Sequence, residues 1–204
     1  EQLISGLPNI FSGVFVIVMV MLYFLNHKVK AKEKLLNIGV LSIFLISFHI
    51  NTFNLIWHGF NPPAWFPYRY SFMFSFVLIF IAYDQFINII KHNINSKCLV
   101  YACVISIVSS VIIFRKKYEF VSIKFIYADI FLVILFCFLI YLLKTLPNKK
   151  QAIIASISLL LGLNLFTNSL FSVRNIKNFD IDLPDSVNAQ DSDEFVHNMQ
   201  PVID

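Results

Sequence analysis

Six long apolar runs constrain this chain more than any other feature of its sequence. They occupy roughly residues 10–25, 35–57, 71–90, 98–114, 125–143 and 152–173. A helix needs about 20 residues to cross a hydrocarbon core ~30 Å thick, and the first and fourth runs lie at the lower limit of that length. Only helices and closed barrels satisfy every backbone polar group inside a bilayer, and the runs lack the alternation of barrel strands. The sequence therefore predicts an all-α fold, a polytopic transmembrane helix bundle of about six spans.

The composition argues against a soluble protein and against a nucleic-acid-binding one. Hydrophobic residues make up 58% of the 204 residues and charged residues only 14%, whereas soluble domains have about 45–50% and about 25%. The net charge is +4, and the basic residues stand in short clusters between the apolar runs, as at a membrane surface. Three cysteines lie in or beside apolar runs without metal-binding spacing, namely Cys98, Cys103 and Cys137. We expect membrane lipids as partners, no nucleic acid, and no metal or cofactor.

The Lys and Arg residues of the short loops predict the orientation, because cytoplasmic loops carry an excess of them. The first, third and fifth connections hold nine, which are Lys28, Lys30, Lys32, Lys34, Lys91, Lys97, Lys144, Lys149 and Lys150. The other side holds seven, which are Arg69, Arg115, Lys116, Lys117, Lys124, Arg174 and Lys177. We therefore expect the first, third and fifth connections on the cytoplasmic side of the membrane, and both termini outside.

The character of the chain changes after Arg174. Residues 180–204 contain seven acidic side chains and no Lys or Arg, so this stretch cannot cross a membrane. Two parts are predicted, a membrane bundle over residues 1–174 and a polar, acidic extracellular segment over residues 175–204. That segment is either a flexible tail or the beginning of an outer domain. Because the chain begins with Glu1, we expect it to be a piece of a longer protein.

The connection between the second and third runs is the most distinctive stretch. Residues 58–72 read HGFNPPAWFPYRYSF, in which three prolines forbid a helix and Gly59 permits a sharp turn. Trp65, Tyr68 and Tyr70 combine an apolar ring with a polar tip and suit the headgroup level. The Arg69 guanidinium can bind a phosphate or carboxylate through two parallel hydrogen bonds. Two interpretations stay open, an outer site for a lipid phosphate or sugar, or an aromatic belt whose arginine reaches the headgroups.

Polar residues also lead into this connection at helical spacing. Steps of four, three and four residues separate them, which places them on one face of a continuous helix: Ser47, Asn51, Asn54 and His58. Such a face either forms hydrogen bonds with a neighbouring helix or lines a wet cavity that opens outward.

Asp84 is an acidic residue within a strong apolar run, and an intramembrane carboxylate is by default a functional candidate. It stands only seven residues before Lys91, near the expected cytoplasmic interface, which favours an ion pair or solvation. The sequence contains no phosphate-binding glycine loop and no recognisable hydrolase or metalloprotease motif. No catalytic residue is therefore assigned within the chain.

The run NLIWHGFNPPAWFPYRYSF at residues 54–72 resembles the signature of the bacterial YfhO family of integral membrane proteins. The first apolar run followed by Lys32-Glu33-Lys34 is also similar to the corresponding segment of that family. YfhO proteins are much longer and have a large extracellular portion. The resemblance therefore implies that this chain is an internal slice that ends as the extracellular part begins.

The resemblance implies a membrane glycosyltransferase of the GT-C type. Such enzymes take a sugar from a polyprenyl-phosphate carrier at the outer leaflet and transfer it to a cell-envelope polymer, for example a teichoic acid. The catalytic acid of such enzymes lies in an early outer loop, and nothing in this chain matches it. The resemblance carries over four candidate substrate or lipid-phosphate contacts, His58, Asn61, Tyr68 and Arg69, supported by the polar face of Ser47, Asn51 and Asn54. The alternatives are a polytopic transporter or lipid flippase, with Asp84 as its best residue, and a non-catalytic membrane scaffold.

Overall fold

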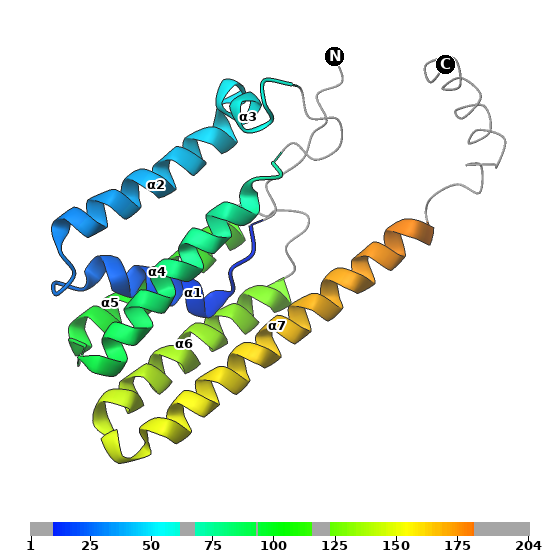
Figure 1. The fold of residues 1–204 in the computed structure, drawn as a ribbon. Coiled ribbons are helices and arrows are strands. Elements are labelled where there is room, and N and C mark those ends of the chain that lie inside the picture. The colour runs from blue at the N-terminus through cyan, green and yellow to red at the C-terminus, as the bar shows by residue number, and fades with distance from the viewer. Residues whose placement is uncertain (1–9, 62–67, 93, 116–122, 182–204) are drawn as a thin grey trace, which may run out of the picture. The chain divides into compact units, whose positions relative to one another are not determined.

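The computed structural model describes residues 10–61, 68–92, 94–115 and 123–181. Every regular element in these stretches is a helix, which confirms the all-α prediction (Figure 1). The elements are α1 (Val14–Leu25), α2 (Ala31–His49), α3 (Asn51–Trp57), α4 (Ser71–Lys91), α5 (Ser96–Arg115), α6 (Ile123–Thr145), the short 3-10 helix η1 (Pro147–Lys149) and α7 (Lys150–Ile181).

The chain divides into two compact units, Glu1–Leu159 and Leu160–Asp204. The first contains α1 to α6, η1 and the first ten residues of α7, whose Ile153 and Ile157 are buried there. The second contains the remainder of α7, which continues to Ile181. The helix therefore extends past residue 174, where the sequence predicted the end of the membrane bundle. The acidic stretch from residue 182 onward lies outside the described residues.

Helix α1 forms the centre of the first unit. It packs against α4, α5 and α6, and α5 pairs with α6 along its length. Val18, Met19 and Leu22 are fully buried, as expected of a helix that is apolar on every side. Phe15 joins two neighbours at once, because its ring lies 5.6 Å from that of Phe86 on α4 and 5.0 Å from that of Phe136 on α6, centroid to centroid.

Within the described residues, three helical segments are long and apolar enough to cross a membrane, Ser71–Lys91, Ile126–Thr145 and Pro147–Leu170. A fourth span results if the bent pair of α2 and α3 counts as one, and two shorter apolar helices occupy Val14–Leu25 and Ser96–Ile112. All six predicted apolar runs are therefore helical, while the number of them that cross a bilayer stays a prediction. The first run begins its helix only at Val14, because Gly13 adopts the left-handed φ of 82°.

The second run is not the continuous helix that the sequence predicted. Helices α2 and α3 meet at Ile50, whose backbone is extended, and their axes differ in direction by 108°. Neither proline nor glycine causes this bend. The Tyr70 hydroxyl donates a 2.8 Å hydrogen bond to the backbone oxygen of Ser47, the atom that would accept the amide of Asn51 in an unbroken helix. The bend therefore leaves no unsatisfied carbonyl at Ser47.

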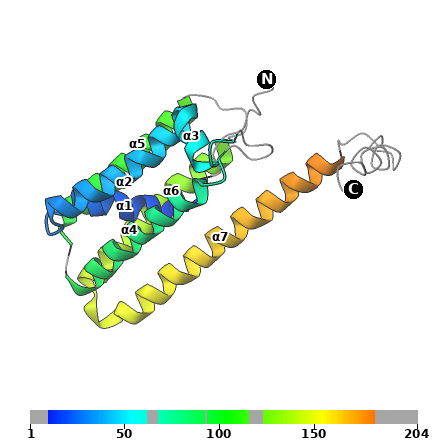
Figure 2. The same cartoon turned by 45° about the horizontal axis from the view of Figure 1, so that its top comes forward.

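The connections that carry most of the lysines meet at one end of the first unit, which we call the lysine end. They join α1 to α2, α4 to α5 and α6 to α7, and Figure 2 shows them together. Side chains satisfy helix carbonyls there. Lys34 Nζ donates to the Phe24 oxygen at 2.8 Å, Lys150 Nζ donates to the Ile90 oxygen at 2.7 Å, and the Cys98 thiol lies 3.4 Å from the Leu25 oxygen.

These contacts place a cation at the C-terminal ends of α1 and α4, where the helix dipole favours positive charge. The last carbonyls of a helix have no partner within it, so a lysine from a neighbouring element replaces the missing amide. A further link is the 2.6 Å hydrogen bond from Lys144 Nζ to Ser96 Oγ, which joins α6 to the first residue of α5. The lysines therefore have a structural role.

Replacing Lys34 with methionine keeps the aliphatic stem but removes the donor to the Phe24 carbonyl. Since a hydrogen bond to a charged group contributes about 1.5–3 kcal/mol, Lys34→Met should lower the free energy of unfolding by roughly that amount. Thermal unfolding of the purified protein in detergent, followed by circular dichroism, measures the effect. Lys32→Met is the matched control because Lys32 is exposed. Equal melting temperatures for the two variants would contradict the capping role.

Candidate functional site

The first candidate site is the turn that precedes α4 and carries Arg69. Its anchor is Tyr70, which is buried and bonds to the Ser47 carbonyl. Trp57, at the end of α3, donates its indole Nε1–H to Ser47 Oγ at 3.0 Å. In a straight helix ten residues span ~15 Å, so this bond exists only because the chain bends at Ile50. Ser47 thereby joins α2, α3 and the turn before α4.

An aromatic cluster surrounds this junction, made up of Phe44, Phe48, Trp57, Tyr68, Tyr70 and Phe74. The rings of Trp57 and Tyr70 are stacked with centroids 5.1 Å apart, and Phe48 stacks on Tyr70 at 5.3 Å. Phe44 stacks on Trp57 at 5.4 Å. Each such aromatic pair contributes ~0.5–1.5 kcal/mol beyond the area it buries. The cluster therefore holds the turn before α4 in a defined position.

The four predicted contact residues lie around this cluster. Arg69 is exposed between Tyr68 and the buried Tyr70, and Tyr68 is half-buried with its ring 6.5 Å from that of Tyr70. His58 caps the end of α3 and is half-buried, and its ring lies 6.1 Å from that of Tyr70. Asn61 is exposed three residues later. The fold thus brings His58 and Tyr68 to the same tyrosine, with Arg69 next to it in the chain.

The chain reverses directly after α3 through a Schellman-type cap. The amide of Phe60 donates to the Leu55 carbonyl at 2.8 Å and the amide of Gly59 to the Ile56 carbonyl at 3.2 Å. Gly59 and Phe60 both have a φ of 64°. Gly59 therefore makes the sharp turn that the sequence predicted. Residues 62–67, which include Trp65 and the three prolines of the predicted loop, lie outside the described residues.

Two polar atoms of this site are buried without a hydrogen-bond partner among the described residues, Asn54 Oδ1 and His58 Nε2. The other ring nitrogen of the histidine, Nδ1, lies 2.9 Å from the Asn54 backbone oxygen, so it carries the proton in the neutral ring. Nε2 is then an acceptor, as is Asn54 Oδ1. Leaving such a buried group unpaired costs about 1–3 kcal/mol, which suggests a place for a hydroxyl donor.

The polar face predicted from the sequence is not a single face. The bend at Ile50 separates Ser47 on α2 from Asn51 and Asn54 on α3. Ser47 and Asn54 are buried, whereas Asn51 is exposed. The spacing argument assumed a continuous helix, and it fails because Tyr70 takes the carbonyl that would have continued α2. The polar residues nonetheless remain near one junction, as the shared contacts of Ser47 show.

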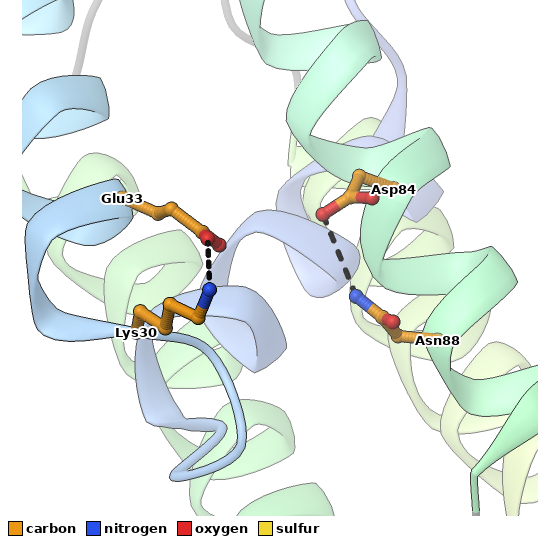
Figure 3. Close-up of polar contacts among 4 residues, drawn as sticks. All are labelled: Lys30, Glu33, Asp84 and Asn88. Carbon is orange, nitrogen blue, oxygen red and sulfur yellow. Dashed lines mark hydrogen bonds and ion pairs between the residues drawn. The ribbon is translucent and has the colours of Figure 1, made fainter.

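A second polar site lies at the lysine end, where a cavity of about 380 Å³ opens between the connection that follows α1, the start of α2, and the end of α4 with the residues directly after it. Asp84 lines this cavity and is exposed, so it does not lie inside the bundle. Asn88 Nδ2 lies 3.4 Å from the Asp84 carboxylate, and Lys30 and Glu33 form an exposed pair at 4.0 Å (Figure 3). No group of three or more His, Cys, Asp and Glu side chains suited to a metal ion occurs among the described residues.

Sequence reasoning did not identify Gln85, which is fully buried on α4 and lines the same cavity. Its Nε2 has no partner within the described chain. The available signal was an amide next to an aspartate inside an otherwise apolar run. Tyr70 was recognised as an aromatic at the headgroup level, but its bond to Ser47 depends on a bend that no local pattern indicates.

Tyr70→Phe removes the hydroxyl that satisfies the Ser47 carbonyl and keeps the stacked ring. We expect the free energy of unfolding to fall by about 1–3 kcal/mol, because the carbonyl is left buried and unpaired. Thermal unfolding in detergent at pH 8 measures this loss. Tyr83→Phe is the control, since Tyr83 is exposed.

The wild type and Tyr70→Phe together also test the ionisation of Tyr70. Burial, and secondarily the nearby Tyr68, raises the pKa of Tyr70 from 10.0 to about 12. Between these values the unfolded chain loses the proton while the folded chain keeps it, so the stability from Tyr70 is complete below pH 10 and declines as the pH rises to 12. The difference in stability between the wild type and Tyr70→Phe should therefore shrink from pH 9 to pH 12. A constant difference would show that Tyr70 is not buried as described.

Comparison with known proteins identifies the chain. A family model described as bacterial membrane protein YfhO matches residues 1–200. No match was found among curated proteins or among solved structures. Because the family model covers nearly the whole sequence, this membrane protein belongs to the bacterial YfhO family.

Proposed function

We propose that the chain is the membrane portion of a bacterial cell-envelope glycosyltransferase that uses a polyprenyl-phosphate-linked sugar at the outer leaflet. Membership of the YfhO family supports the assignment of the chain as a membrane protein. The finer assignment rests on the turn before α4. Its acceptor would be an envelope polymer such as a teichoic acid, and the bilayer would be the plasma membrane.

The observation that carries the proposal is an exposed arginine next to a buried, hydrogen-bonded tyrosine. Tyr70 is held by Ser47 and by stacked rings, so the backbone that carries Arg69 is fixed while its side chain is exposed and can reach a ligand. A planar guanidinium can bind a phosphate through two parallel hydrogen bonds. Holding its backbone in advance lowers the entropy cost of that binding.

Exposed apolar side chains next to this turn suit the carrier's hydrocarbon chain. Phe72 and Phe76, on the first turns of α4, are 68% exposed, and Phe60 is 75% exposed. A polyprenyl chain needs such an apolar path below its phosphate. His58, Asn61 and Tyr68 would then contact the sugar. His58 Nε2, which has no partner among the described residues, would accept from a hydroxyl. Catalysis itself needs an acid that we do not assign to this chain.

The orientation is part of the proposal. The lysine end faces the cytoplasm, as the excess of Lys and Arg in its connections favours, and the turn with Arg69 faces outward. The acidic segment after α7 is then extracellular. The alternative of a transporter depends on Asp84 as an intramembrane carboxylate, and the exposure of Asp84 at the lysine end does not favour it.

Arg69→Ala in the full-length protein should reduce transfer of sugar from the lipid-linked donor by at least about 100-fold, since both phosphate bonds and the charge are lost. Arg69→Lys should retain part of the activity, because it keeps the charge but loses the bidentate geometry. Incorporation of radiolabelled sugar from a purified polyprenyl-phosphate donor into the envelope polymer measures both.

Lys97→Ala is the control for this series, because Lys97 is an exposed cation at the lysine end. It should leave transfer unchanged. Wild-type turnover by Arg69→Ala would remove the phosphate-binding role of Arg69. Equal loss in Lys97→Ala would indicate a general effect of surface charge.

Side-specific labelling tests the orientation. Cys98, Cys103 and Cys137 are first replaced by alanine, and single cysteines are introduced as Arg69→Cys and Lys32→Cys, both at exposed positions. In intact cells a membrane-impermeant maleimide should modify position 69, and position 32 only after the membrane is permeabilised. The reverse pattern would place the turn with Arg69 in the cytoplasm and end the proposal.

A further inference from the structure

The cavity at the lysine end contains a buried donor whose direction the structure fixes. The amide of Lys28 donates to Asn26 Oδ1 at 3.0 Å, so the other terminal atom of Asn26 is the nitrogen. That Nδ2 donates to Gln85 Oε1 at 3.2 Å. The remaining terminal atom of Gln85 is therefore Nε2, a donor that is buried and has no acceptor in the described chain.

This relay of hydrogen bonds, from Lys28 through Asn26 to Gln85, determines that the cavity favours a ligand with a hydrogen-bond acceptor. A backbone N–H can only donate a hydrogen bond. Each bond in the series therefore fixes which terminal atom of the next side chain is the acceptor and which is the donor. Because Gln85 lines the cavity, an oxygen of a bound molecule would complete the relay. A buried donor without an acceptor is unfavourable, so an acceptor that reaches Gln85 is favoured over an empty cavity.

The charged side chains around the cavity include both signs. Lys28 and Lys30 supply two cations, and Glu33 and Asp84 supply two anions. Figure 3 shows the pair of Lys30 and Glu33 facing Asp84 and Asn88 across the space between them. The lysines and Gln85 suit an anionic oxygen, while Asp84 and Glu33 suit an ammonium. A zwitterion fits this lining better than an anion, since an anion alone would meet two carboxylates.

Apolar surface continues from the charged lining toward the middle of the helices. Leu36, three residues beyond Glu33 on α2, is 67% exposed, and Phe80, four residues before Asp84 on α4, is 63% exposed. Residues three or four apart share a helix face, so each carboxylate stands at the end of an apolar strip. A polar cavity at a helix end with apolar strips below it matches a molecule with a polar head and hydrocarbon tails.

We propose that this cavity binds the headgroup of a phosphatidylethanolamine-type lipid in the leaflet on the lysine side. A phosphate oxygen accepts from Gln85 Nε2 and from the lysines, and the primary ammonium donates to Asp84 and Glu33. The acyl chains run along Leu36 and Phe80. This site is separate from the turn with Arg69 and does not depend on the proposed glycosyl transfer.

Native mass spectrometry of the detergent-purified protein tests the proposal through the apparent Kd of added lipids. Dioleoyl-phosphatidylethanolamine should bind about tenfold more tightly than dioleoyl-phosphatidylglycerol, which lacks the ammonium. It should also bind about tenfold more tightly than dioleoyl-phosphatidylcholine, whose quaternary ammonium has no N–H. That factor corresponds to one charge-assisted hydrogen bond. Soluble O-phosphoethanolamine, added at the same concentrations, distinguishes a lipid from a free zwitterion and should bind at least about tenfold more weakly.

Gln85→Glu keeps the acceptor for Asn26 but replaces the free donor with a carboxylate oxygen, and should weaken phosphatidylethanolamine binding at least about tenfold. The matched control is Gln151→Glu, the same substitution at an exposed position on α7, which should leave binding unchanged. Asp84→Asn lies at an exposed position and tests the ammonium contact even if Gln85→Glu does not fold. It should abolish the preference for phosphatidylethanolamine over phosphatidylglycerol.

Three results would overturn the proposal. Equal affinity for the three lipids would exclude recognition of the ammonium. An unchanged lipid preference in Asp84→Asn would place the binding elsewhere. Binding of O-phosphoethanolamine as tight as that of the lipid would identify a soluble zwitterion as the ligand. Arg69→Ala should bind phosphatidylethanolamine normally even if it loses transfer activity, because the two sites are separate.

Discussion

The structure depends on the requirement that every backbone carbonyl in an apolar bundle finds a donor. In water a helix end is solvated, but next to hydrocarbon an unpaired carbonyl costs several kcal/mol. Side chains from neighbouring elements meet this requirement at one helix bend and at two helix ends. Tyr70 serves Ser47 at the bend, Lys34 serves Phe24 at the end of α1, and Lys150 serves Ile90 near the end of α4. The same bonds hold the helices in their places.

Each candidate site contains buried side-chain polar atoms that have no partner among the described residues. At the turn before α4 these atoms are acceptors, Asn54 Oδ1 and His58 Nε2, beside an exposed arginine. At the lysine end the unpaired atom is a donor, Gln85 Nε2, beside charged side chains of both signs. The two sites therefore call for different ligands. The ligand we propose for the turn is a phosphate with sugar hydroxyls, and the ligand we propose for the cavity is a zwitterionic headgroup.

The sequence predicted the elements well and the shape of one of them wrongly. Long apolar runs and the absence of alternation were sufficient for an all-α bundle, and Gly59 marked the turn after α3 correctly. The resemblance at residues 54–72 identified the family, which the family model confirms. The spacing of Ser47, Asn51, Asn54 and His58 suggested one helical face, but the bend at Ile50 divides it. The roles of His58, Asn61, Tyr68 and Arg69 stay predictions.

The sequence by itself determined that the chain is helical and belongs in a membrane, because apolar length and backbone hydrogen bonding act within each segment. It also determined which connections carry the lysines. Only the tertiary structure decided where α2 ends, since the donor that replaces its next amide is a tyrosine 23 residues away. It alone decided that Gln85, which lines a cavity, holds a buried donor without an acceptor among the described residues, because the hydrogen bonds run from Lys28 through Asn26 to a residue on α4. Such long-range donors leave no periodic signal in a sequence.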